Sequence, residues 1–337
     1  MSHPQDRKAH FDPQNLLERR ELVTHLKPQE MLECPKCGKK NPANRLSCFY
    51  CVAELPVSSS TGSSQLKLNL RKLESWESGF NVMVKTAGEV GDKDIFAELA
   101  GMAGLSVELM SNILSSGILL PIARLESEKE AEHIVDAAES AGLLSMNIPD
   151  VDLMLAEQPV RLWHIELHHD VAMFITFNQR EVVEVPFKDI RRCVCGQLNE
   201  TRSETSNKFK KGKAEVIDEL ATATDKRVVD VYTKGEPRGY RISTAGFDFS
   251  ALGSQKSMLA AENLDLLVNE LASRGVSTRV DRKYNEVRNL LNDVWELEST
   301  DQTYGLKIAG IGKRKVDRVA TSNNELQFLK YARSRIF

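Results

Sequence analysis

Residues 79–148 alternate between the hydrophobic periods of strands and of helices. Apolar positions repeat every second residue in Phe80–Val84, which is typical of a strand, and further strands are expected over 118–123 and 143–148. Helical spacing is expected over 94–99, 107–114 and 127–141. The last helix would begin at Ser127 with Glu130 in the capping-box position and end before Gly142. The order predicts a compact βααβαβ unit of the α+β class over about 79–150.

Residues 159–276 have a different pattern, in which short Val-, Ile- and Phe-rich runs are separated by polar turns. Seven strands are expected, over 160–167, 171–177, 181–185, 190–195, 227–233, 240–243 and 247–249. A polar insertion, 197–214, interrupts them, and a helix with one apolar stripe is expected over 257–274. This order predicts a small barrel or sandwich that is closed by a helix.

The remaining segments are more polar. Residues 1–30 form a charged N-terminal segment, and the Ser-rich run near 58–65 predicts a flexible linker over 57–78. Residues 277–337 predict a basic helical tail, with helices over about 283–297 and 324–335. The whole chain is therefore expected to be a multi-domain α+β protein.

Four cysteines near the N-terminus have the spacing of a metal site. Cys34, Cys37, Cys48 and Cys51 form a C-x2-C-x10-C-x2-C pattern. Each pair of thiolates can hold one side of a tetrahedral ion, and four thiolates leave no open coordination position. A unit this short cannot close a hydrophobic core unaided, whereas a structural zinc ion can fold it. We expect one structural zinc per chain; two disulfides or free thiols are the alternatives.

This pattern resembles the zinc ribbon family over residues 33–55, within a predicted domain 31–56. Val52 departs from the family, which often has glycine after the second pair. The lysines and arginine of this unit, Lys36, Lys39, Lys40 and Arg45, would be its contacts if it bound nucleic acid.

The segment that opens with Phe80-Asn81-Val82 and ends its last helix at Ala141-Gly142 resembles the C-terminal domain of the bacterial ribosomal stalk protein, over about 79–148. In that family, basic residues of the first two helices engage translational GTPases. The matching positions here are not basic: Ala97, Ala100, Glu108 and Ser111. The resemblance therefore implies the fold and not that function. A generic α+β domain is the alternative.

Residues 160–274 are similar to pleckstrin-homology-like (PH-like) domains, with seven short strands and then a capping helix. Such domains often bind phosphoinositides through basic residues in the first strand connection. Here this connection is His168-His169-Asp170, which favours protein binding over lipid binding. His164, His168 and His169 could bind metal, but a solvated cluster is the simpler interpretation. Cys193 and Cys195, on one face of a predicted strand, could be a redox or metal pair, although buried strand cysteines are commoner.

Near the C-terminus, Gly310-Ile311-Gly312 followed by Lys313, Arg314 and Lys315 resembles the hairpin of helix-hairpin-helix DNA-binding motifs. That resemblance implies that backbone N–H groups would meet a phosphate and that the three cations would add salt-sensitive affinity. An amphipathic tail with an accidental Gly-x-Gly is the alternative.

Composition and charge narrow the function classes. The chain has 337 residues, 41% hydrophobic and 28% charged, with no apolar run long enough to span a membrane and no apolar N-terminal signal, so we expect a cytoplasmic protein. The net charge is +2 over 1–56, −9 over 62–158, zero over 159–276 and +4 over 277–337. Only the two ends are therefore suited to a polyanion.

No catalytic signature occurs in the sequence: there is no Gly-x-Ser-x-Gly, His-Glu-x-x-His, dinucleotide fingerprint or kinase motif set. We expect a non-catalytic, zinc-binding modular adaptor that binds other proteins. The alternative, from another class, is a nucleic-acid-binding protein that uses the zinc ribbon and the C-terminal Gly-Ile-Gly hairpin.

Overall fold

The computed structural model describes residues 31–42, 48–51, 53, 55, 71–74, 76–86, 93–210, 213–310 and 313–337. The chain divides into two compact units, Met1–Asn69 and Leu70–Phe337. The polar segment 1–30 and the part of the predicted linker over 57–70 lie outside the described residues. The rest of that linker is not free, because Leu73 is buried in the second unit.

The first unit contains a short antiparallel hairpin, β1 (Met31–Glu33) and β2 (Lys40–Pro42). Its buried cluster consists of Cys34, Cys48 and Leu55. Three side chains are too few to stabilise a fold by hydrophobic burial alone.

The second unit begins with a three-stranded antiparallel sheet in the order β4-β3-β5. Its strands are β3 (Phe80–Thr86), β4 (Leu120–Leu125) and β5 (Leu143–Pro149). Its helices are α2 (Lys93–Ala103), α3 (Val107–Ser115) and α4 (Glu128–Ser140). The predicted βααβαβ order is confirmed. Strand β4 is buried along its whole length, as its apolar sequence indicated.

A nine-stranded mixed sheet follows among the described residues, in the order β13-β14-β9-β10-β11-β6-β7-β8, with β12 paired to β9. The first strands are β6 (Val160–Leu167), β7 (Val171–Thr176), β8 (Val182–Pro186), β9 (Ile190–Lys210), β10 (Lys213–Thr233) and β11 (Tyr240–Ser243). The last are β12 (Arg279–Asp281), β13 (Glu298–Gly310) and β14 (Lys313–Asn323). Three 3-10 turns cover Phe187–Asp189, Ser250–Gln255 and Arg288–Leu291.

The predicted closed barrel is wrong. The sheet stays open, with β8 and β13 as its edge strands. The predicted strand 247–249 is reduced to a single bridge between His164 and Asp248. The capping helix is present as α5 (Ala260–Arg274), and its stripe Leu264, Leu267, Val268 and Leu271 joins the core of the sheet.

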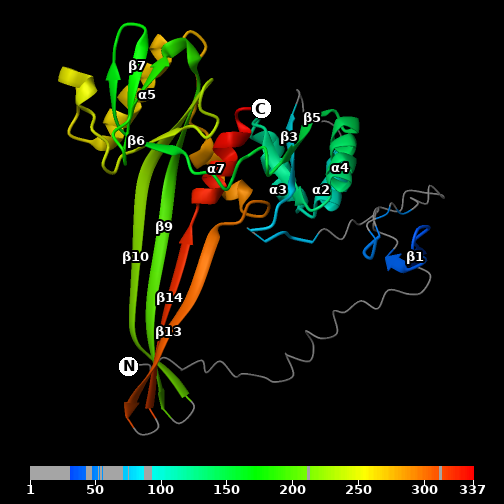
Figure 1. The fold of residues 1–337 in the computed structure, drawn as a ribbon. Coiled ribbons are helices and arrows are strands. Elements are labelled where there is room, and N and C mark those ends of the chain that lie inside the picture. The colour runs from blue at the N-terminus through cyan, green and yellow to red at the C-terminus, as the bar shows by residue number, and fades with distance from the viewer. Residues whose placement is uncertain are drawn as a thin grey trace, which may run out of the picture. The chain divides into compact units, whose positions relative to one another are not determined.

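The predicted polar insertion at 197–214 and part of the predicted helical tail are instead strands. The second half of β9 pairs with β10 on one side and with β14 on the other, and β14 pairs with β13. These four strands form an arm that extends away from the rest of the sheet (Figure 1). Eleven paired residues at about 3.3 Å each make the arm roughly 35 Å long.

The C-terminal residues are integrated into the second unit. The predicted helix 283–297 is reduced to α6 (Tyr284–Val287) and the 3-10 turn that follows it. The last helix is confirmed as α7 (Glu325–Ser334), which is buried from Gln327 onward. Arg333 of α7 donates to the carbonyls of Leu153 (2.8 Å) and Glu157 (2.6 Å), so this helix is bonded to the connection between the two sheets.

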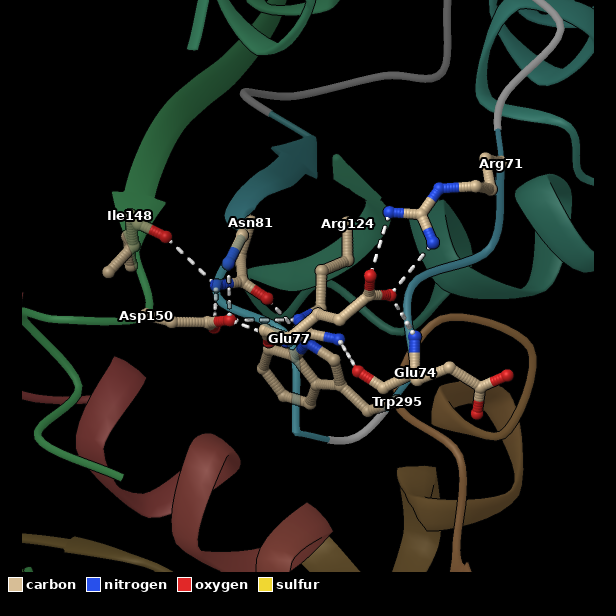
Figure 2. A network of polar contacts seen from close by, with 9 residues as sticks. Arg71, Glu74, Glu77, Asn81, Arg124, Ile148, Asp150 and Trp295 are labelled. Carbon is tan, nitrogen blue, oxygen red and sulfur yellow. Dashed lines mark hydrogen bonds and ion pairs between the residues drawn. The ribbon is translucent and has the colours of Figure 1, made fainter. Parts of the chain in front are cut away.

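A buried polar network joins the small sheet to the C-terminal part (Figure 2). Arg124 of β4 forms an ion pair with Asp150 (2.6 Å), and Asn81 of β3 donates to the same carboxylate (2.8 Å). Trp295, which is 1% exposed, donates its indole N–H to the Asn81 side-chain oxygen (2.8 Å). Every polar group of the network therefore has a partner inside the protein.

Candidate metal centre

The first cysteine pair lies on the turn of the β1–β2 hairpin. The backbone N–H of Gly38 donates to the carbonyl of Cys34 (2.9 Å), and the N–H of Cys34 donates to the carbonyl of Lys39 (3.0 Å). Gly38 has a φ of +66°, a left-handed conformation that residues with a Cβ adopt only with strain. The glycine thus lets the chain reverse directly after Cys37.

The second pair lies on a turn that is fixed by Asn41. The side-chain oxygen of Asn41 accepts the backbone N–H of Phe49 (2.8 Å), and its amide N–H donates to the sulfur of Cys48 (3.3 Å). The N–H of Tyr50 also donates to that sulfur (3.4 Å). Asn41 is fully buried, and the sequence analysis missed it; its only signal was a short polar residue between two Cys-x-x-Cys pairs.

The four sulfurs converge. The ligand atoms of Cys34, Cys37, Cys48 and Cys51 all lie within 4.8 Å of one another. The Cys34–Cys51 and Cys37–Cys48 sulfurs are 3.6 and 3.5 Å apart, far beyond the roughly 2.05 Å of a disulfide. Two sulfurs at about 2.3 Å from a tetrahedral ion are separated by roughly 3.8 Å. The two-disulfide alternative is wrong, and the four cysteines could hold a metal ion.

The environment of Cys48 favours a thiolate. Burial opposes ionisation of this thiol, but the N–H groups of Tyr50, Cys51 and Asn41 around its sulfur lower its pKa to about 6. The thiolate is the form that binds metal. N–H donors to a ligand sulfur also orient the ligand and disperse its charge.

The other predicted cysteine pair has a different environment. Cys193 and Cys195 lie on β9, where Cys193 is fully buried and Cys195 packs against the same hydrophobic core. Burial raises the pKa of these thiols to about 12 and about 11. Burial in the hydrophobic core is the commoner role of a strand cysteine, and this is the environment of both residues.

The three histidines do not form a metal cluster within the described part of the chain. His164 is buried, and its Nδ1 lies 2.9 Å from the carbonyl of Asp248. His168 and His169 are solvent-exposed, and each lies beside a carboxylate, Glu166 or Asp170.

The C-terminal residues predicted to contact nucleic acid lie on a β-hairpin and not on a helix-hairpin-helix motif. Gly310 ends β13, and Lys313, Arg314 and Lys315 begin β14. Gly312 lies outside the described residues. Without a helix after the glycines, the helix N-terminus that would bind a phosphate is missing from this motif.

The largest cavity among those described, about 900 Å³, lies beside α7 and is lined by several carboxylates. Four of them lie within 4 Å of an arginine: Glu77–Arg71 (2.9 Å), Asp150–Arg124 (2.6 Å), Glu157–Arg238 (3.8 Å) and Glu325–Arg241 (2.8 Å). These ion pairs hold the carboxylates that line the cavity in place.

No described helix combines the length and the apolar character needed to cross a lipid bilayer. The chain matches no protein-family model, no curated protein and no solved structure.

Proposed function

We propose that this protein is a non-catalytic adaptor that binds other proteins and whose N-terminal unit is folded by one structural zinc ion. The convergence of four sulfurs within 4.8 Å carries the proposal. A zinc ribbon over residues 33–55 accounts for this arrangement, because four thiolates saturate a tetrahedral ion and leave no position for substrate or water.

Elemental analysis tests the zinc. We expect one zinc per chain in the purified protein and its loss in Cys34→Ser. The matched control is Cys195→Ser, which makes the same substitution at a cysteine of β9 outside both ligand turns and should keep the metal. A protein that keeps residues 31–55 folded without any metal would refute the proposal.

Two further observations support the modular part of the proposal. The element order of 79–149 agrees with a ribosomal-stalk-like domain. The core under α5 has the capping helix of a PH-like domain but not its closed barrel. Both resemblances concern fold and assign no partner. The connection after β6 contains His168, His169 and Asp170 and offers no basic cluster to a phosphoinositide.

The exposed rings of the metal-binding turn are the best candidates for contacting a protein partner. Phe49 and Tyr50 are 69% and 56% exposed and meet edge to face, with ring centres 5.5 Å apart. The ammonium group of Lys39 lies 4.3 Å from the Tyr50 ring centre. Tyrosine and other aromatic side chains contribute much of the binding energy in protein interfaces.

Cross-linking in nuclease-treated extract, followed by purification of the full-length protein, tests the adaptor role. We expect a defined protein partner that is lost in the Phe49→Ala, Tyr50→Ala variant while zinc content is unchanged. Leu144→Ala is the control, since it removes another side chain of which 56% is exposed, on β5. Recovery of no protein partner, or of the same proteins by all variants, would contradict the adaptor role.

Nucleic-acid binding is the second candidate function. The zinc ribbon would contribute Lys36, Lys39 and Lys40. Independently of the zinc unit, the pairing of β9 with β14 places lysines of two distant segments next to each other, which also favours this candidate.

A further inference from the structure

Two lysine-containing segments lie far apart in the sequence. The first, at the end of β9 and the start of β10, contains Lys208, Lys210 and Lys213. The second, at the end of β13 and the start of β14, contains Lys307, Lys313 and Lys315. Almost one hundred residues separate them. By itself neither segment is a large basic patch.

The strand register brings the two segments together at the end of the arm. Lys210 of β9 pairs with Lys213 on β10 and with Lys313 on β14. Two residues earlier, Lys208 pairs with Lys315, which in turn pairs with Lys307 on β13. Figure 1 shows these four strand ends side by side.

All six lysines occupy positions on one face of the sheet. Directly paired residues of neighbouring strands share a face, and so do residues two apart on one strand. The six positions form two adjacent rows, spaced about 4.8 Å between strands and about 7 Å along them. The same rows hold one acidic residue, Glu215, paired with Lys208, and the next row holds Asp218 and Asp317.

We propose that this lysine face binds the phosphate backbone of a nucleic acid. Six lysines at adjacent positions of two rows bring six positive charges to one end of the arm, and a chain of phosphates that crosses both rows would neutralise them. The four strands are roughly 14 Å wide, more than the approximately 12 Å of the major groove of B-DNA. Contact is therefore with phosphates and not with base edges, so binding does not depend on sequence.

The opposite face of the same strand ends favours nucleic acid over a lipid surface. Arg314 pairs there with Phe209 on β9 and with Ile308 on β13. A cation between two apolar positions is unfavourable for insertion into a bilayer. An arginine beside an aromatic residue is common in proteins that bind single-stranded nucleic acids.

Fluorescence anisotropy of the full-length protein with a labelled 30-nucleotide single strand of mixed sequence tests the proposal. Six phosphate contacts predict that the logarithm of the binding constant falls against the logarithm of salt concentration with a slope of about −4. The Lys210→Glu, Lys313→Glu variant removes two contacts, so the slope should become about −3 and binding at 0.1 M salt should weaken about 25-fold or more.

The matched control is Lys226→Glu, an exposed lysine on β10 that lies thirteen residues from Lys213. It should bind like the unmodified protein. The neutral Lys208→Gln, Lys315→Gln variant, with an unchanged circular dichroism spectrum, separates loss of charge from loss of fold and should also weaken binding. Cys34→Ser tests the zinc unit separately. It should retain the nucleic-acid binding that depends on the lysine face, so the two proposals can fail independently.

Several results would overturn the proposal. The first is that Lys226→Glu weakens binding as much as Lys210→Glu, Lys313→Glu does. The second is a salt slope that neither variant of the lysine face changes, and the third is no binding at 0.05 M salt. Vesicles that contain 30% phosphatidylserine are the second probe. The lysine face would be assigned to a lipid surface instead if the protein bound these vesicles but not the oligonucleotide, and if the variants of the lysine face lost the vesicle binding.

Discussion

The ion pair of Arg124 and Asp150 offers a sharp test of how the second unit is held together. Only 5% and 6% of their side chains are exposed. Besides the ion pair, the Asp150 carboxylate accepts the backbone N–H of Gly79 (2.8 Å) and the side-chain N–H of Asn81 (2.8 Å). Arg124 also donates to the carbonyls of Glu74 and Glu77 (Figure 2). Gly79, Asn81 and Arg124 therefore all donate to this one carboxylate.

Asp150→Ala leaves a guanidinium buried without its counter-charge and two N–H groups without an acceptor. Removal of one partner of a buried pair costs about 3–5 kcal/mol. Replacing both partners, in Arg124→Met with Asp150→Ala, removes the unpaired charge but still leaves the N–H groups of Gly79 and Asn81 unsatisfied. The double variant should therefore recover about 2 kcal/mol relative to the sum of the single variants.

Urea unfolding, followed by the fluorescence of the tryptophans, measures these free energies. Arg71→Ala is the control, because the Arg71–Glu77 pair is 54% and 29% exposed and should contribute at most about 1 kcal/mol. If Asp150→Ala cost no more than Arg71→Ala, or if the two changes at Arg124 and Asp150 were additive, the network would not be the junction that its geometry indicates.

Three further predictions concern other sites. Burial lowers the pKa of Lys330 to about 8, so below pH 8 the folded state bears the full cost of a buried charge, and this cost disappears as the pH rises toward 10.5. Lys330→Met should therefore stabilise the protein by about 3 kcal/mol at pH 7 and have no such effect near pH 10.5, as thermal unfolding at several pH values will measure. A Cβ on Gly196 would lie 2.3 Å from the ring of Phe328, so Gly196→Ala should destabilise by about 1–3 kcal/mol, and an equal midpoint in urea would contradict the packing of α7. Chelation of the metal should unfold residues 31–55 and leave the thermal transition of 70–337 unchanged, because the buried core among the described residues of the first unit is only Cys34, Cys48 and Leu55; hydrogen exchange resolved along the chain distinguishes the two parts.

The sequence by itself determined the features that depend on local spacing. Four cysteines in two short turns indicate a site that could hold a metal ion, because the two cysteines of each pair are close along the chain. The unit from β3 to β5 was predictable because its apolar positions follow strand and helix periods and its helices end at suitable residues, such as Gly142 after α4. The last helix was predictable for the same reason.

The arm was decided only by the tertiary structure. Its strands, such as Asn199 to Ser206 of β9, carry Thr, Ser, Glu and Arg on both faces. A strand that is solvent-exposed on both faces has no apolar alternation, so its sequence resembles that of a loop. Its partner β14 lies more than one hundred residues away, and pairing of that range leaves no local signal.

The candidate metal site and the proposed lysine face divide in the same way. The four cysteines that could hold a metal ion were identified from the sequence, whereas Asn41 beside them and the lysine face at the end of the arm were not. Asn41 is polar but buried, and only the folded turn shows which sulfur it contacts. The six lysines become one surface only because the register aligns two hairpins, and alignment of strands is a property of the folded sheet and not of either segment.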